Sequence, residues 1–216
     1  MSRFVGPRLK VMRALGVDLP GLSRKTIEAR PFPPGQHGNK ASRKRRSDFG
    51  VKLQEKQKIR FNYGLTETQM RRLILDARKG KEPTGERLLQ LLERRFDNVV
   101  FRAGYAPTVI AARQLVSHGH LMLNGKAANI PSIRLNIGDE VSIKVKSKNI
   151  PMVIETIKAP ALARPEWMSW DESAQAVKVR ICQQLAMCRF LLMCNWSLSI
   201  TLIEFSYSIC SVRKRI

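Results

Sequence analysis

Residues 91–144 read LLERRFDNVVFRAGYAPTVIAARQLVSHGHLMLNGKAANIPSIRLNIGDEVSIK, and this stretch decides the fold. Its first half has helical periodicity. One short helix is predicted over residues 95–104, and a second begins after Thr108, which is a good helix cap, and stops at Gly119. The period then changes to that of strands, with a tight-hairpin signal at residues 124–125, Asn-Gly. Two helices followed by short strands predict an α+β module.

The strand half of this module contains a clear alternating segment. Residues 140–146, EVSIKVK, alternate Val141, Ile143 and Val145 with polar residues, so we expect a strand that is buried on one face. It follows a turn at residues 137–139. We therefore predict a small antiparallel sheet beside two helices and place this module at residues 94–155.

Positive charge is the dominant feature of the composition. The 216 residues include 39 Lys and Arg against 17 Asp and Glu, a formal net charge of +22. Such an excess attracts polyanions, most often nucleic acid and more rarely an anionic membrane. Aromatic residues make up 6%, which disfavours single-strand binding by base stacking and favours contact with the phosphates of folded RNA or a duplex. The alternative is a soluble protein with basic faces.

The first 47 residues are predicted to form an extended basic arm. The stretch RPFPPGQHG at residues 30–38 imposes turns and forbids a long helix. Four consecutive cations follow at Arg43, Lys44, Arg45 and Arg46. Like charges packed this closely repel one another unless phosphates neutralise them, so we expect these residues to bind RNA. The alternative is a solvated tail.

Residues 48–93 are predicted to form a helical body. Three helices are expected, at residues 48–63, 66–79 and 86–94, and Thr66 and Gln69 of the second match a capping box. Residues 156–179, which are rich in Ala and Pro, look like a looser connector that completes this body.

Catalytic and metal-binding motifs are missing from the sequence. It has no Gly-rich loop before a Lys-Ser/Thr pair, no HExxH and no nucleophile elbow. His118 and His120 flank a glycine at a predicted helix end, which is a turn position more often than a ligand pair. All four cysteines lie after residue 181, which fits a reducing compartment. We therefore expect no enzyme activity, no cofactor and no metal.

Four arginines flank or project from the two predicted helices of the module: Arg94, Arg95, Arg102 and Arg113. A guanidinium group holds a phosphate through two hydrogen bonds and keeps its charge when partly desolvated. Helix N-termini near Asp97 and Thr108 could add amide donors. The alternative is that these arginines pair with Glu93 and Asp97 on a solvated face.

The quoted stretch strongly resembles the RNA-binding module of the S4 family of bacterial and organellar small-subunit ribosomal proteins. The matching motifs, in order, are residues 95–100, 112–116, 118–120, 124–125, 131–132 and 138–139. The arm matches as well, at residues 34–38 and at 48–50 leading into 54–58. The resemblance covers about residues 1–179. Pseudouridine synthases, tyrosyl-tRNA synthetases and heat-shock RNA binders share the module, but they carry it with different neighbours.

The resemblance implies a fold and a role. The fold is α+β, a helical body with a basic arm plus a two-helix, antiparallel-sheet module of the alpha-L-like S4 type. The role is that of a structural ribosomal protein that binds the 5′ domain of small-subunit ribosomal RNA, nucleates assembly, touches neighbouring ribosomal proteins and affects decoding accuracy. It implies a place in the ribosome of a bacterial cytoplasm or an organellar stroma or matrix, with no small-molecule substrate and no membrane partner. The alternatives are a free-standing regulator of structured messenger and the guide module of an RNA-modifying enzyme.

The candidate RNA-binding residues combine the basic run, two lysines of the body, and polar and basic side chains of the module: Arg43, Lys44, Arg45, Arg46, Lys56, Lys58, Arg94, Arg95, Asn98, Arg102, Thr108, Arg113, Gln114, Ser117, His118, His120, Asn124 and Lys126.

Three departures from the family pattern stand out. Val109 occupies a position where relatives usually have arginine, so one expected RNA contact is missing. The arm lacks the cysteines of the family's zinc knuckle, which indicates the zinc-free type. Residues 180–216, beginning RICQQLAMC, do not resemble the family's apolar C-terminal strand.

We interpret the atypical tail, residues 180–216, as the product of a reading-frame shift. Its DNA can be written so that a neighbouring frame encodes a family-like ending. The alternatives are a metal site, which the cysteine spacing does not fit, and a membrane span at residues 190–210, which Asn195 and Glu204 interrupt.

Overall fold

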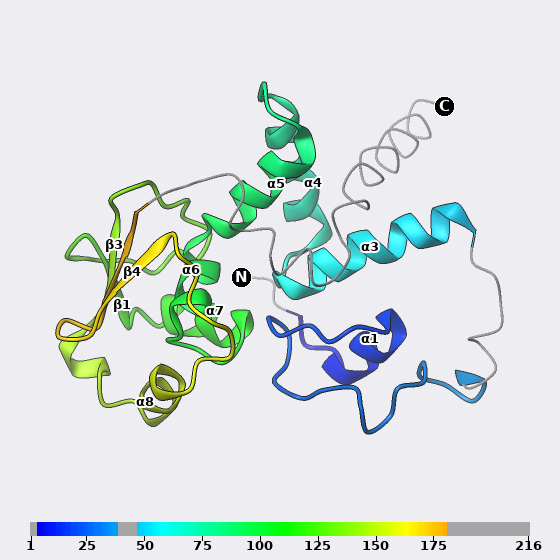
Figure 1. The fold of residues 1–216 in the computed structure, drawn as a ribbon, viewed down its shortest axis with the longest axis horizontal. Helices are drawn as coiled ribbons and strands as arrows, with labels where there is room; N and C mark the ends of the chain where they lie inside the picture. The colour runs from blue at the N-terminus through cyan, green and yellow to red at the C-terminus, as the bar shows by residue number, and fades with distance from the viewer. Residues whose placement is uncertain (1–3, 39–46, 181–216) are drawn as a thin grey trace. The chain divides into compact units, whose positions relative to one another are not determined.

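The computed structural model describes residues 4–38 and 47–180 (Figure 1). They form two compact units, one that ends at Arg87 and one that begins at Leu88, and each is described by itself. The basic run at residues 43–46 and the tail from residue 181 lie outside the described residues.

The first unit is helical. Its helices are α1 (Arg8–Leu15), α3 (Asp48–Asn62) and α4 (Glu67–Arg78), and α5 (Thr84–Glu93) crosses into the second unit. The capping box predicted for α4 is confirmed, because Thr66 Oγ1 accepts from Gln69 N at 3.3 Å and Thr66 N donates to Gln69 Oε1 at 3.1 Å. The apolar stripe of α4 is buried, at Met70, Leu73, Ile74 and Ala77.

The N-terminal segment is part of this unit's core, so the prediction of an extended arm is wrong for residues 8–22. Four of its apolar side chains are buried: Met12, Leu15, Leu19 and Leu22. Gln54 Nε2 on α3 donates to the carbonyl oxygen of Leu15 at 2.7 Å. The backbone N–H of Gly21 donates to Asn62 Oδ1 at 3.1 Å. These contacts fix the segment against α3.

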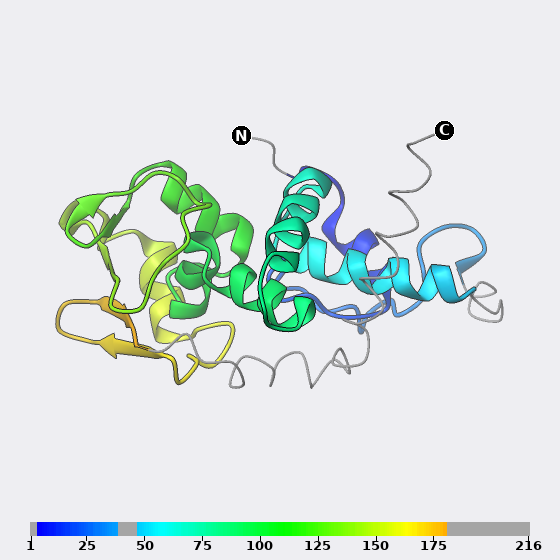
Figure 2. The ribbon, with the colours of Figure 1, turned by 90° about the horizontal axis from the view of Figure 1, so that it is seen from above.

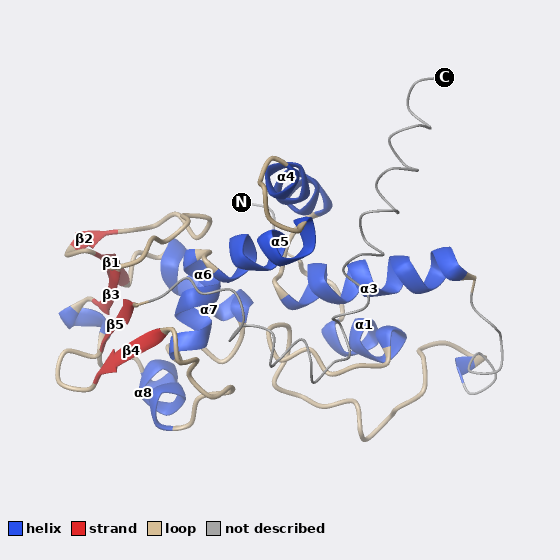
Figure 3. Cartoon of the chain, turned by 45° about the horizontal axis from the view of Figure 1, so that its top comes forward, coloured by secondary structure: helices blue, strands red, loops and turns tan. Residues whose placement is uncertain are grey.

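The second unit combines helices with a sheet, which confirms the α+β class. Its two central helices are α6 (Phe96–Ala103) and α7 (Val109–Ser117). The strands are β1 (Leu121–Leu123), β2 (Lys126–Ala127), β3 (Glu140–Ile143), β4 (Met168–Asp171) and β5 (Ala176–Val179). All neighbouring strands are antiparallel, in the order β2-β1-β3-β5-β4 (Figure 3).

The hairpin predicted between β1 and β2 is confirmed. Asn124 and Gly125 at its tip have φ angles of 49° and 76°. Two consecutive positive φ angles are typical of the tight hairpin turn that matches the twist of the strands. Met122 lies opposite Ala127 in the resulting ladder.

The C-terminal part of the module departs most from the prediction. Helix α8 (Pro151–Lys158) is followed by the hairpin of β4 and β5, drawn in yellow and orange in Figure 2. β5 pairs with β3, and Val177 lies opposite Val141. The interpretation that residues 156–179 complete the helical body is therefore wrong: their strands cover the edge that β3 would otherwise expose.

β3 is also shorter than predicted. It ends at Ile143 and a 3-10 turn, η1 (Val145–Ser147), follows. The side chain of Val145 is 82% exposed, although alternation placed it in the core. The apolar pattern alone could not show that the chain turns away after Ile143.

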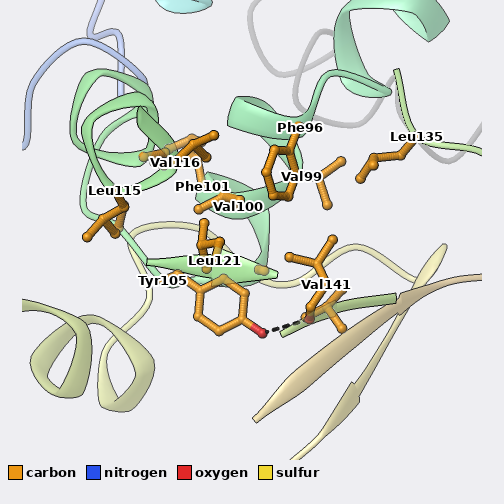
Figure 4. Packing of buried hydrophobic residues seen from close by; sticks show 14 of the residues in the cluster. Phe96, Val99, Val100, Phe101, Tyr105, Leu115, Val116, Leu121, Leu135 and Val141 are labelled. Atoms are coloured by element: carbon orange, nitrogen blue, oxygen red, sulfur yellow. Dashed lines mark hydrogen bonds between the residues drawn. The ribbon is translucent and has the colours of Figure 1, made fainter. Parts of the chain in front are cut away.

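Side chains from α6, α7 and the sheet form one core (Figure 4). Tyr105 is fully buried in this core, and its one hydroxyl hydrogen is shared between the backbone oxygens of Gln175, at 2.7 Å, and Val141, at 3.3 Å. Burial raises the pKa of Tyr105 above its ordinary value of 10.0, since the phenolate would lose its hydration. The core therefore ties the helix pair to β3 and β5.

Candidate nucleic-acid interface

One buried carboxylate joins the two helices of the module. Asp97, in the first turn of α6, is fully buried. It accepts from Arg95 through Nε at 3.1 Å and Nη2 at 2.8 Å. It also accepts from Arg113 of α7 through Nε at 3.1 Å and Nη2 at 2.7 Å. The paired group carries a net positive charge, because two guanidinium groups share a single carboxylate.

A second buried carboxylate holds the end of α5 against α6. Glu93 Oε1 accepts from Arg102 Nη2 at 2.8 Å, and Glu93 Oε2 accepts from Asn98 Nδ2 at 2.6 Å. Glu93 is 3% exposed. Buried ion pairs cost desolvation energy and are stable only when their hydrogen bonds are satisfied, as they are here.

These networks change the interpretation of the predicted arginines. Arg95, Asn98 and Arg113 are buried, so Arg113 does not project from α7 as predicted. The ion pairs with Glu93 and Asp97 that formed the alternative are present, but they lie in the interior and not on a solvated face. The structure gives these side chains a role in fixing the angle between helices.

The first backbone N–H groups of α6 already donate to other residues of the chain, so they are not available to a phosphate. The N–H of Phe96 donates to the carbonyl oxygen of Ile133 at 2.9 Å, and that of Asp97 donates to Pro131 at 3.1 Å. At α7, Thr108 is buried and its hydroxyl accepts from Ala111 N at 3.2 Å. Thr108 is therefore a helix cap, and the predicted amide site near Asp97 is already occupied by the chain itself.

The outer edge of α7 is polar and accessible. Gln114, Ser117 and His118 are exposed. Ser117 Oγ donates to the carbonyl oxygen of Arg113 at 2.8 Å, one turn earlier. Because Arg113 is anchored to Asp97, this edge sits on a fixed helix.

A basic loop continues from this edge. Gly119, with φ 72°, ends α7, and the rings of His118 and His120 have centroids 6.0 Å apart. His120 Nδ1 and Ser147 Oγ are hydrogen-bonded at 2.9 Å. Lys144 lies beside the loop, since its Nζ would be 3.7 Å from a Cβ placed on Gly119. The loop can present hydrogen-bond donors and positive charge together.

Of the predicted residues in the hairpin and at Arg94, two make structural hydrogen bonds and one is exposed. Asn124 Nδ2 donates to Asp139 Oδ1 at 2.9 Å and its Oδ1 accepts from Glu140 N at 2.8 Å, so Asn124 braces the turn. Lys126 is exposed. Arg94 donates to the carbonyl oxygen of Leu135 at 2.9 Å, which anchors a neighbouring loop.

Carboxylates are almost absent from one half of the second unit. Asp97 is the only Asp or Glu in residues 94–138, and it is buried. The same stretch holds six lysines and arginines: Arg94, Arg95, Arg102, Arg113, Lys126 and Arg134. No Asp or Glu of this stretch therefore faces solvent, which favours phosphate binding, and the carboxylates of Asp139 and Glu140 follow it next to Asn124 of the hairpin.

Comparison with known proteins decides the family. The ribosomal protein S4/S9 N-terminal domain matches residues 3–93, and the S4 domain matches residues 94–141. The chain belongs to the ribosomal protein S4 family. The small ribosomal subunit protein uS4 of Methylobacillus flagellatus is 73% identical over 179 residues, which is 83% of this chain and 87% of that relative.

Two further relatives extend the likeness within the S4 family. The protein uS4B of Nitrosomonas europaea is 71% identical over 179 residues, with the same shares of 83% and 87%. The protein uS4c of Cyanophora paradoxa is 46% identical over 180 residues, 83% of this chain and 88% of that relative. The change from one matched domain to the next falls between residues 93 and 94.

The predicted lysines of the body are paired in this S4-family chain. Lys56 Nζ donates to Glu67 Oε1 and Lys58 Nζ donates to Glu55 Oε1, each at 2.6 Å, and both lysines are buried. They therefore stabilise α3 and its junction with α4. The four cations at residues 43–46 lie outside the described residues.

Sequence reasoning missed two basic residues of the second unit. Arg134 is exposed, and its backbone bridges to that of Arg95. Lys144 joins the histidine loop only through the fold, at the end of β3. The sequence signal for Arg134 was its place in the carboxylate-free stretch; Lys144 looked like any solvent-facing strand residue.

Metal ligands do not gather in the described residues: no group of three His, Cys, Asp or Glu side chains there could hold an ion. Val109, the position at which the resemblance predicted an arginine, is buried in the core. Within the described parts, no helix is long and apolar enough to cross a membrane.

Proposed function

We propose that the chain is a structural component of the small ribosomal subunit that binds small-subunit ribosomal RNA, in the 5′ domain. Its membership of the S4 family supports this, as do relatives named as small ribosomal subunit proteins over 83% of the chain. The same relatives support a ribosomal role over an enzyme's guide module, since this chain covers 87% of their length.

The observation that carries the proposal is the braced helix pair of residues 94–138, a stretch in which no Asp or Glu faces solvent. RNA helices are recognised by shape, phosphates and 2′-hydroxyls, which a rigid polar surface suits. Gln114, Ser117 and His118 supply hydrogen-bonding groups there, and Lys126 and Lys144 supply charge on the same unit.

The buried arginines act through these exposed groups. Arg95 and Arg113 share Asp97, and the resulting net positive charge lies just under the α7 edge. In a low-dielectric interior this charge is poorly screened, so it adds to the attraction for a nearby phosphate. Arg95 and Arg113 therefore position α7 and make the electrostatic potential near its exposed edge more positive.

The wider role follows from the family resemblance. We propose early binding during subunit assembly, contact with neighbouring ribosomal proteins and an effect on decoding accuracy. The basic run at residues 43–46 is proposed to bind phosphates too.

Co-sedimentation with small ribosomal subunits tests the proposal against a free-standing messenger regulator. The tagged chain is expressed in a bacterium that also makes the host's uS4, and its position in a sucrose gradient is measured. Comigration with the small subunit through a high-salt wash is expected. Recovery only at the top of the gradient would contradict the ribosomal assignment.

A further inference from the structure

The tip of the hairpin between β1 and β2 carries the one Asn-Gly pair of the sequence, Asn124-Gly125. Asparagine before glycine deamidates readily, because glycine has no Cβ to shield its backbone nitrogen from the asparagine side chain. Both residues are exposed, and no described residue beyond the chain neighbours comes within 4 Å of a Cβ placed on Gly125. The N–H of Gly125 donates to no acceptor in the described parts of the chain. The nucleophile for deamidation is therefore open to solvent.

The side chain of Asn124 is engaged by the start of β3. Its Nδ2 donates to Asp139 Oδ1 at 2.9 Å, and its Oδ1 accepts from Glu140 N at 2.8 Å. Asp139 is itself fixed, since its Oδ2 accepts from Asn136 N at 2.7 Å and its carbonyl oxygen accepts from Val179 N at 3.0 Å. The amide group must break its hydrogen bonds before its carbon can turn toward the backbone nitrogen that follows it.

Deamidation at this pair needs only water and a base from the solvent. The base removes the proton of the Gly125 N–H, and the nitrogen attacks Cγ of Asn124. An N–Cγ bond forms, the Cγ–Nδ2 bond breaks, and ammonia leaves after it takes a proton from water. Water then opens the five-membered imide at either carbonyl, which gives aspartate or isoaspartate. No atom is oxidised or reduced.

We propose that Asn124-Gly125 is a site of spontaneous deamidation whose rate is set by the carboxylate of Asp139. The hydrogen bond from Nδ2 to Asp139 holds the amide in an unreactive position. The product has a carboxylate oxygen in place of Nδ2, which lies 2.9 Å from Asp139 Oδ1, and two carboxylates at this distance repel each other. The contact that delays the reaction therefore becomes repulsive once the reaction has occurred.

The product changes the hairpin in two further ways. Isoaspartate adds a methylene to the backbone, which disturbs the two-residue turn and the register of Met122 opposite Ala127. The new negative charge also lies two residues from Lys126, so it offsets that cation. A consequence for RNA rests on the proposed function: the modified hairpin is less attractive to phosphates.

The test measures isoaspartate in the full-length chain during incubation at neutral pH. Enzymatic methylation of isoaspartyl carboxylates gives the rate, and mass mapping of tryptic peptides gives the position. D139A removes the acceptor of Asn124 Nδ2, whereas D139N keeps an oxygen acceptor. V116A, in the buried core on α7, is the matched control for lost stability, which urea unfolding measures.

D139A is expected to form isoaspartate at residue 124 roughly tenfold faster than wild type, the factor that one charge-assisted hydrogen bond corresponds to. D139N and V116A should stay close to the wild-type rate. Asn129 and Asn136, each followed by a β-branched isoleucine, are internal controls and should remain unmodified. N124D, which copies one product, should show faster hydrogen exchange of the hairpin amides and weaker binding to a 5′-domain transcript.

Three outcomes overturn the proposal. The first is a rate in D139A equal to or below that of wild type. The second is equal acceleration in V116A and D139A at equal loss of stability, which would make unfolding the cause. The third is wild-type hydrogen exchange in N124D, which would show that the product leaves the hairpin closed. These three readouts involve no RNA, so a wild-type chain that does not bind the transcript removes the proposed function alone.

Discussion

Arg113 Nε and Nη2 both donate to one oxygen of Asp97, Oδ2, at 3.1 and 2.7 Å, across the gap between α7 and α6. Arg95 completes the cluster from the other side. An arginine that the sequence suggested as an RNA contact is therefore held in the interior. The RNA-binding surface proposed for this S4-family chain rests on an ion cluster that lies in the interior.

Asp97→Asn should destabilise the second unit strongly. The change leaves two buried guanidinium groups without a counter-charge, and breaking a buried pair costs roughly 3 kcal/mol or more. Urea unfolding measures the free energy. Glu172→Gln, at an exposed position, is the control and should stay within about 0.5 kcal/mol of wild type. Equal stability of the two variants would mean that the cluster is not structural.

Arg113→Ala and Gln114→Ala should separate stability from binding. Arg113→Ala is expected to lower the unfolding midpoint, because Asp97 loses a buried partner. Gln114→Ala removes an exposed hydrogen-bonding group, so the midpoint stays and RNA affinity falls by about 1 kcal/mol. Circular dichroism and fluorescence anisotropy measure the two quantities. If Arg113→Ala weakens RNA binding at an unchanged midpoint, Arg113 is instead a direct contact.

Tyr105→Phe should reduce the loss of stability at alkaline pH. The pKa of Tyr105 is raised in the folded chain, so the unfolded chain loses its phenolic proton first, from about pH 10 upward. This contribution to stability is full below the ordinary pKa of 10.0 and is lost as pH rises toward the raised value.

Wild type and Tyr105→Phe are compared by thermal unfolding between about pH 8 and 11, a window that spans the ordinary pKa of tyrosine. The variant is expected to be less stable by about 1 kcal/mol at pH 8, since the backbone oxygens of Gln175 and Val141 lose the hydroxyl that they share as a donor. The difference should shrink as pH rises. A difference that stays constant across this range would show that Tyr105 does not titrate differently in the two states.

Gly21→Ala should release the N-terminal segment. A Cβ on Gly21 would overlap the backbone oxygen of Asn62, so the segment must shift away from α3. Overpacking of this kind costs about 1–3 kcal/mol. Hydrogen exchange should rise in residues 8–22. Gly50→Ala, within α3, is the matched control and should leave exchange there unchanged; comparable protection in both variants would argue against a docked segment.

Features of the fold that depend on residues close together in the sequence could be predicted. The Thr66–Gln69 capping box and the Asn124-Gly125 hairpin each depend on a few neighbouring residues, and both form as predicted. The docking of residues 8–22 was missed, although Met12, Leu15, Leu19 and Leu22 have helical spacing, because basic residues around them suggested an arm.

Features that depend on distant partners could not be read from the sequence. β5 pairs with β3 across more than 30 residues of sequence. The Ala- and Pro-rich stretch at residues 156–179 contains no local pattern that predicts this pairing. The burial of Arg113 likewise depends on Asp97, 16 residues earlier and on another helix. The net charge and the motifs predicted that the partner is RNA. Only the fold distinguishes the buried arginines that hold the helices in place from the exposed side chains that are free to contact RNA.

The most direct test of the account is the affinity of the purified chain for a 5′-domain transcript of small-subunit ribosomal RNA, titrated from low to high salt beside an unrelated folded RNA of equal length. We predict tighter binding to the ribosomal transcript and an affinity that falls steeply and linearly in log–log form as salt rises. Equal affinity for the two RNAs, or no binding at low ionic strength, would contradict the central claim.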